Sequence, residues 1–137
     1  MLGTVPNLNK NWIYHCLLVG TGGFIGSILR FSFGNLVHHQ FPTGMLPYGT
    51  LGVNVIGCLV MGCLGGITDA YQIATTEFRL FLFVGLLGGF TTFSAFGYET
   101  LTLIRTAEPL RAVGNIGLQL VFGLAAVSIG YSLGNRI

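Results

Sequence analysis

The residues of this chain with the clearest potential for chemistry lie together in residues 88–96, which read Gly-Gly-Phe-Thr-Thr-Phe-Ser-Ala-Phe. They lie inside an uncharged run, residues 80–98, that is long enough to cross a bilayer as a helix. Two adjacent glycines followed by two threonines are typical of an interrupted helix. Backbone groups freed at membrane depth must be satisfied by protein, an ion or a water-filled cavity. The segment therefore predicts a buried polar site that is able to hold an ion.

Polar donors are concentrated near this predicted break. The hydroxyls of Thr91, Thr92 and Ser94 can donate or accept hydrogen bonds. In the preceding apolar run, Thr50 and Asn54 are four residues apart and share one helix face. An asparagine inside a membrane is costly unless it has partners. The residues alone leave open whether these groups line an ion path or only bond one helix to another.

Two aromatic rings and the backbone extend this chemistry. Phe93 and Phe96 are three residues apart, and the positive edges of such rings can favour a small anion. If the broken segment met its copy across a two-fold axis, carbonyls from both copies would converge, and a small hard cation is their natural occupant. No His/Asp/Ser constellation for catalysis is present, and Glu99, near the end of its helix, is expected in water. We therefore expect a non-enzymatic protein whose interior suits passage of a small hydrated anion.

The composition places these residues in a membrane. Charged residues make up 7% of the 137 residues, against about 25% in a soluble domain. Hydrophobic residues make up 52%, and 22 residues are glycine, which indicates an integral membrane protein of one domain. Six basic residues form no patch for nucleic acid. Cys58 and Cys63 have no nearby histidine, so zinc is not expected.

The apolar runs predict one all-α domain, residues 1–137, with four transmembrane helices, the third interrupted near its centre. We expect these helices over residues 12–36, 48–67, 80–104 and 112–135. Between them, residues 38–47, with His38 and His39, form a predicted loop, and residues 69–79 a solvated turn. On the fourth helix, Asn115 and Gln119 are one turn apart and make a second polar stripe.

The basic residues divide evenly between the two sides of the membrane. Four spans place Lys10, Arg79 and Arg136 on one side and Arg30, Arg105 and Arg111 on the other. The positive-inside rule therefore gives no orientation. A chain that inserts both ways can assemble as an antiparallel, dual-topology two-fold dimer. Arg30 itself has two open interpretations, snorkelling to the head groups or lining an aqueous vestibule that attracts anions.

Three motifs together resemble the Fluc/CrcB family of fluoride channels, and the resemblance extends across nearly the whole chain. They are residues 22–26 (Gly-Gly-Phe-Ile-Gly) followed by Arg30, residues 49–54 (Gly-Thr-Leu-Gly-Val-Asn), and residues 88–96. The resemblance implies a multi-pass channel of the cell membrane that exports cytoplasmic fluoride passively. It also implies an antiparallel homodimer with two pores in the lipid bilayer, in which a paralogous chain can take the place of the second copy.

The resemblance further implies individual roles. A structural sodium ion (Na+) would lie at the dimer centre, held by the backbone carbonyls of Gly88 and Thr91, and Arg30 would occupy a vestibule. The fluoride pore would be lined by Asn54, Thr50, Phe93, Phe96 and Ser94.

The chain departs from the family pattern at two positions. Ala95 stands where the family commonly has threonine, which removes one hydroxyl from the polar lining. On the fourth helix the family's polar track matches Asn115 and Gln119, but its next position is Gly123, which has no side-chain donor. The central site and the phenylalanine pair are therefore better matched than the lining from the fourth helix.

Two other functions fit the size and helix number. A dual-topology exporter of the small-multidrug-resistance kind needs a membrane-embedded acid on the first helix, where this chain offers only Arg30. Glu99 is the single candidate to replace that acid. A non-transporting membrane scaffold would use the glycines and amides for assembly alone. Ion flux distinguishes the scaffold from both transporters.

Overall fold

The computed structural model describes residues 10–41 and 46–137, and within these ranges all regular secondary structure is helical, without strands. Its elements, in order, are α1 (Lys10–Gln40), α2 (Tyr48–Tyr71), α3 (Thr76–Phe78), the π-helix η1 (Arg79–Leu87), α4 (Gly88–Phe90), α5 (Phe93–Arg105) and α6 (Pro109–Gly134). They form four segments long and apolar enough to span a membrane, Asn11–Gln40, Tyr48–Tyr71, Thr76–Arg105 and Pro109–Gly134. The predicted all-helical membrane protein class is confirmed.

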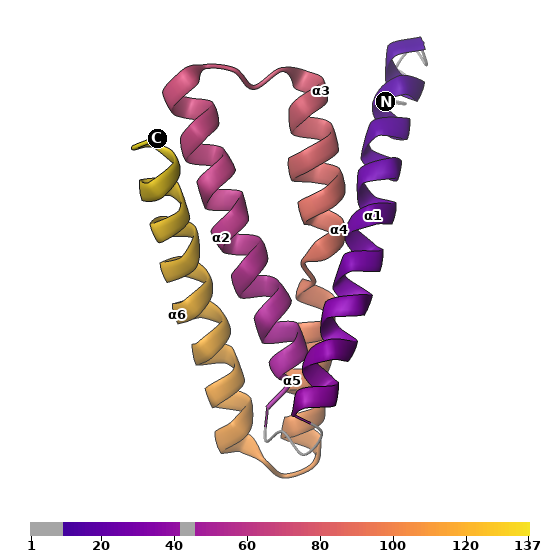
Figure 1. The fold of residues 1–137 in the computed structure, drawn as a ribbon. Helices are drawn as coiled ribbons and strands as arrows, with labels where there is room; N and C mark the ends of the chain where they lie inside the picture. Colours follow the sequence, from indigo (N-terminus) through magenta and orange to yellow (C-terminus); the bar gives the residue numbers. More distant parts are fainter. Residues whose placement is uncertain (1–9, 42–45) are drawn as a thin grey trace, which may run out of the picture.

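The spans are arranged as two packed pairs (Figure 1). One pair is α2 with α6, and the other is α1 with η1 and α4. The pairs approach each other at the end of the molecule where α5 lies and diverge toward the end where α2 connects to α3 (Figure 1). α1 begins and α6 ends at that diverging end (Figure 1).

The third span changes its backbone conformation twice. After the π-helical η1, α4 ends at Phe90, and the next two residues, Thr91 (φ −83°, ψ 160°) and Thr92 (φ −150°, ψ 113°), are extended. α5 then starts at Phe93, and the Thr92 hydroxyl caps it by accepting a hydrogen bond from the backbone N–H of Ala95. Residues 91–92 therefore separate two helical segments within one span.

Glycines allow the paired spans to touch through their backbones. In the α2–α6 pair, a Cβ atom added to Gly130 would overlap the carbonyl oxygen of Leu59. In the other pair, a Cβ on Gly26 of α1 would overlap the carbonyl oxygen of Leu86. Small residues at helix–helix contacts are the main means by which membrane helices pack closely.

Gly130→Ala is accordingly expected to destabilise the protein, because the new methyl group meets backbone that cannot rotate away. Overpacking of this kind costs about 1–3 kcal/mol. Gly117→Ala, on the same helix with nothing within 4 Å of the added Cβ, is the control. It should be neutral or stabilising by up to about 1 kcal/mol, because alanine favours helix. Thermal unfolding in detergent, followed by circular dichroism, measures both; equal shifts of the melting temperature would contradict the packing assigned to Gly130.

Several predicted helix ends were wrong. His38 and His39, expected in a loop, belong to the last turn of α1. No proline or glycine interrupts the chain between Asn35 and Phe41, so nothing in these residues stops the helix. Asp69, expected in a turn, lies in α2, which ends where Gln72 takes a left-handed conformation with φ 54°. Residues 42–45 of the expected loop lie outside the described residues.

α6 begins earlier than predicted. It starts at Pro109, which was expected in the preceding loop. Proline is favoured at the first helical positions because the N–H that it lacks has no helical partner there.

Candidate functional site

Asn54 connects three spans at the extended residues of the third one. Its Nδ2 donates to the carbonyl oxygen of Thr92 at 3.1 Å, and its Oδ1 accepts from the Thr92 N–H at 2.8 Å. The same Nδ2 also donates to Oε1 of Gln119 on α6, at 3.0 Å. One amide thus makes hydrogen bonds to both the N–H and the C=O group of Thr92. Backbone groups that are freed where a helix breaks inside a membrane need such partners, because no bulk water is present there.

The extended conformation removes the helical donors of several carbonyls, among them those of Gly88 and Thr91. In a continuous α-helix, the N–H of Thr92 would donate to the carbonyl of Gly88, and the N–H of Ala95 to the carbonyl of Thr91. Here the Thr92 N–H donates to Asn54, and the Ala95 N–H donates to the Thr92 hydroxyl at 3.2 Å. Gly88 and Thr91 are the residues for which the sequence analysis expected carbonyl ligands.

Arg30 reaches this region from α1. Its Nη1 donates to the carbonyl oxygen of Thr91 at 3.4 Å, and the residue is half-buried. Of the two interpretations left open by the sequence, this contact favours a position beside the break over extension to the head groups. Sequence spacing alone did not reveal that Arg30 and Thr91 meet, because they lie on different spans.

The hydroxyls near the break are mostly committed to the backbone. Thr91 Oγ1 donates to the carbonyl of Leu87 at 3.0 Å, within its own helix. Thr92 Oγ1 lies 3.2 Å from Oγ of Ser94, which is an exposed residue. Of the three hydroxyls, that of Ser94 is therefore the one that is exposed to an ion or water.

The two predicted phenylalanines form a ring pair. The centroids of Phe93 and Phe96 are 5.4 Å apart with the rings inclined by 60°, an edge-to-face arrangement. Phe93 is 82% exposed, whereas Phe96 is partly buried. The first residue after the extended segment thus has a ring that contacts Phe96 and is otherwise largely exposed.

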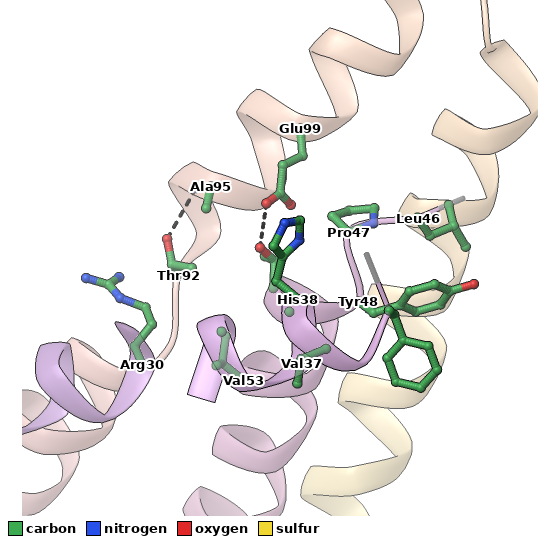
Figure 2. Close-up of a pocket in the computed structure, with 14 residues that line it drawn as sticks. Arg30, Val37, His38, Leu46, Pro47, Tyr48, Val53, Thr92, Ala95 and Glu99 are labelled. Carbon is green, nitrogen blue, oxygen red and sulfur yellow. Dashed lines mark hydrogen bonds between the residues drawn. The ribbon is translucent and has the colours of Figure 1, made fainter. Parts of the chain in front are cut away.

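A cavity of about 460 Å³ opens beside the break, between α1, α2 and α5 (Figure 2). Its polar lining includes Arg30, His38, Thr50, Thr92 and Glu99. Arg30 and Thr92 lie on one side of it, and His38 and Glu99 on the other (Figure 2). The cavity therefore connects a fixed positive charge with a carboxylate that the sequence analysis did not assign to the site.

Glu99 was expected in water, and this expectation was wrong. Its Oε1 accepts a hydrogen bond from Oγ1 of Thr50 at 2.6 Å, while its Oε2 is buried without a hydrogen-bond partner among the described residues. The reason is that α5 turns Glu99 toward α2 rather than outward. Its spacing of three residues from Phe96 was the available signal, because residues at this spacing are near one face.

Thr50→Val should lower the stability of the protein, because it removes the only hydrogen bond that the described residues make to the Glu99 carboxylate. Leaving a buried polar group unpaired costs about 1–3 kcal/mol. Thr102→Val is the control, since its exposed hydroxyl only donates to the carbonyl of Tyr98 in its own helix. Melting temperatures in detergent measure the difference, and an unchanged value for Thr50→Val would show that this pair contributes nothing.

The polar stripe predicted on the fourth helix is divided between two partners. Asn115, only 1% exposed, donates to Oγ1 of Thr100 on α5 at 2.9 Å. Gln119 instead accepts from Asn54, and its Nε2 is buried with no partner among the described residues. Gly123 follows one turn later, where an added Cβ would lie 3.7 Å from Sγ of Cys58. Gln119 therefore belongs to the break, and Asn115 to the α5–α6 contact.

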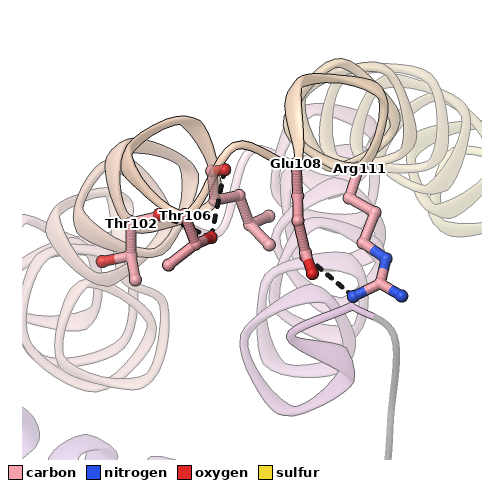
Figure 3. A network of polar contacts seen from close by, with 5 residues as sticks. Thr102, Thr106, Glu108 and Arg111 are labelled. Atoms are coloured by element: carbon pink, nitrogen blue, oxygen red, sulfur yellow. Dashed lines mark hydrogen bonds and ion pairs between the residues drawn. The ribbon is translucent and has the colours of Figure 1, made fainter.

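A second cavity, of about 430 Å³, lies near the α5–α6 connection and shares Glu99 with the first. Its lining includes Glu108 and Arg111, whose side chains form an ion pair of 2.7 Å (Figure 3). Both side chains are more than a third exposed, so this pair stabilises the fold by about 0–1 kcal/mol at most.

No group of three or more histidine, cysteine, aspartate or glutamate side chains able to hold a metal occurs in residues 10–41 and 46–137. Carbonyl oxygens are hard ligands that suit small hard cations.

The sequence matches the family described as CrcB-like protein, Camphor Resistance (CrcB), over residues 17–131. A protein of Hyphomonas neptunium named fluoride-specific ion channel FluC is 43% identical over 122 residues, which cover 88% of this chain and 95% of the relative. A protein of Clostridium novyi with the same name is 40% identical over 121 residues, covering 88% and 94%. Fluoride-specific ion channel FluC 1 of Methanosarcina acetivorans is 36% identical over 118 residues, covering 86% and 88%. These relatives are named as ion channels, which agrees with the expectation of a non-enzymatic protein.

Proposed function

We propose, from the fact that this chain belongs to the CrcB family, that it is a fluoride-selective ion channel. The observation that carries the proposal is the extended segment at Thr91 and Thr92, held by Asn54 and followed at once by the exposed ring of Phe93. The names of the relatives support fluoride as the ion. The channel would export cytoplasmic fluoride passively across the cell membrane and so relieve its toxicity.

Selectivity would come from replacing the water shell of the ion with donors fixed on rigid helices. We propose Asn54, Thr50, Phe93, Phe96 and Ser94 as the residues of the fluoride path. The ring edges would meet the anion, and the exposed Ser94 hydroxyl would donate to it. Asn54 would act chiefly by holding Thr92 in position, since both ends of its amide are engaged.

The fourth helix contributes less directly. Gln119 has an Nε2 group without a partner among the described residues, whereas the Nδ2 group of Asn54 already donates two hydrogen bonds. Gln119 would therefore supply the amide donor of the fluoride path. Asn115 would support the path by fixing α5 through Thr100. Arg30 would place a positive charge at the wall of the vestibule, which we identify with the larger cavity.

The proposed assembly is an antiparallel, dual-topology homodimer with two pores, and a paralogous chain is an alternative second subunit. The even distribution of basic residues supports insertion in both directions. The 82% exposure of Phe93 in the single chain supports a neighbour at that face, either the second copy or the bilayer.

A structural sodium ion fits the residues present at the break. The carbonyls of Gly88 and Thr91, which would hold it, are those whose helical donors are redirected to Asn54 and to the Thr92 hydroxyl. When bound, the ion would offset the repulsion between the negative carbonyl oxygens that two copies bring together at the dimer centre. Asn54 would keep the Thr92 N–H away from the Gly88 carbonyl and so leave this carbonyl available.

Fluoride efflux from proteoliposomes tests the proposed function. Vesicles loaded with potassium fluoride should release fluoride to an electrode when valinomycin lets potassium move with it. Release no faster than from protein-free vesicles would contradict a channel and leave the scaffold interpretation. Proton-coupled transport of a cationic drug that is lost in Glu99→Gln would instead indicate a multidrug exporter.

A further inference from the structure

One face of α1 carries two basic side chains into the larger cavity. Arg30, Gly34 and His38 follow one another at four-residue intervals on one helix face, and all three line the cavity. The helical rise separates Arg30 from His38 by about 12 Å along the axis of α1. Figure 2 shows the two side chains on opposite sides of the cavity. A Cβ atom added to Gly34 would meet nothing within 4 Å, so the helix surface between them is open at this position.

The imidazole of His38 is available to a ligand. The residue is exposed, lies in the last turn of α1, and makes no hydrogen bond or ion pair with another described residue. Glu99 lines the same cavity, but the only ion pair of the described residues lies in the second cavity, so Glu99 does not neutralise His38 by direct contact. His39, the next residue along the helix, does not line the cavity.

The formal charges that face this cavity cancel while His38 is neutral. Arg30 contributes one positive charge and an ionised Glu99 one negative charge, and Tyr48 on α2 contributes none. Protonation of His38 adds one positive charge at the end of α1. The protonation state of this one residue therefore decides whether the cavity is formally neutral or positive.

Histidine is the side chain that ordinarily changes charge between about pH 5 and 8. We propose that His38 is a second, proton-dependent anion-binding residue of the vestibule, two helical turns nearer to the end of its span than Arg30. The inference rests on the proposed channel function and assigns this residue to the entry of fluoride. A positive charge in a cavity raises the local concentration of anions. Fluoride would be concentrated at protonated His38 and would pass the open surface at Gly34 to reach Arg30.

Initial rates of fluoride efflux test the proposal, measured at pH 5.5 and at pH 8.0 with the same pH on both sides of the vesicle membrane. Wild type should release fluoride about threefold faster at pH 5.5, the effect of one added charge a few ångströms from an anion in an aqueous cavity. His38→Gln should be slow at both pH values, and His38→Lys, which stays charged, should be fast at both. His39→Gln is the matched control and should keep the wild-type pH dependence. Protein-free vesicles at each pH give the leak of hydrogen fluoride, which is subtracted.

The same variants distinguish His38 from the other ionisable groups around it. Those groups line the two neighbouring cavities and are Arg30, Tyr48, Glu99, Glu108 and Arg111. A pH dependence that belonged to any of them would persist in His38→Gln.

Chemical modification measures anion binding on the wild-type protein without a flux assay. Diethyl pyrocarbonate reacts with the unprotonated imidazole of accessible histidines, and tandem mass spectrometry follows His38 and His39 separately. At pH 6.5, potassium fluoride should slow modification of His38 by up to about threefold relative to potassium gluconate, because the proton and the anion favour each other's binding by the same factor. Modification of His39 should not change.

Three results would overturn the proposal: equal pH dependence in wild type and His38→Gln, slow release by His38→Lys at pH 8.0, or modification of His38 that fluoride does not alter. Fluoride efflux together with any of these results would leave the channel function intact. Absence of efflux from every variant at both pH values, with His38 still protected by fluoride, would refute the channel and retain the anion site.

Discussion

Asn54→Asp is expected to reduce fluoride efflux by about 100-fold or more, the size expected from losing two hydrogen bonds in a charged setting. The substitution replaces Nδ2, which donates to the Thr92 carbonyl and to Oε1 of Gln119, with an oxygen that can only accept. Three acceptors would then face one another, and a carboxylate would be placed next to the path of an anion. Efflux from proteoliposomes, measured with a fluoride electrode, checks this result.

The matched control is Asn135→Asp, the same chemical change at an exposed residue beyond the end of α6. It should conduct at the wild-type rate. The Asn54→Asp protein should still elute as a dimer in detergent, so that slow efflux reports the path rather than loss of assembly. Full-speed efflux through Asn54→Asp would refute the role assigned to this amide.

Phe93→Ile is expected to slow fluoride efflux at least tenfold while leaving the melting temperature almost unchanged. The ring of Phe93 is 82% exposed, so its loss removes little packing within the chain. Isoleucine keeps an apolar side chain but has no positive ring edge to meet an anion. Efflux and thermal unfolding on the same preparations separate the two effects.

Phe24→Ile serves as the comparison, since Phe24 is also strongly exposed, at 69%, but lies on α1 and is not a member of the ring pair. It should leave efflux unaltered. If Phe93→Ile and Phe24→Ile conducted equally well, the ring pair would have no part in the fluoride path.

The sequence predicted the class of the protein and the segment in which the third span changes conformation. Long apolar runs indicate spanning helices wherever they occur, and four such helices are present. Glycine and threonine pairs act locally on the backbone, so residues 88–96 could be selected as the candidate site before any contact was known. The extended conformation of Thr91 and Thr92 lies within that segment.

The contacts between spans could be predicted much less well from the sequence. The rotation of α6 about its axis depends on backbone contacts such as Gly130 against Leu59, and that rotation sends Asn115 to Thr100 rather than to Asn54. Similarly, the partner of Glu99 is a hydroxyl on α2, which no spacing along α5 reveals. Periodicity shows which side chains share a face, but not which other helix that face meets.

The central claim is that the broken third span forms a path selective for fluoride, and paired anion efflux tests it most directly. Identical proteoliposomes are loaded with potassium fluoride or potassium chloride, and release is started with valinomycin in both. Rapid release of fluoride with retention of chloride is the predicted result. Equal release of both anions, or release of neither, would contradict the account.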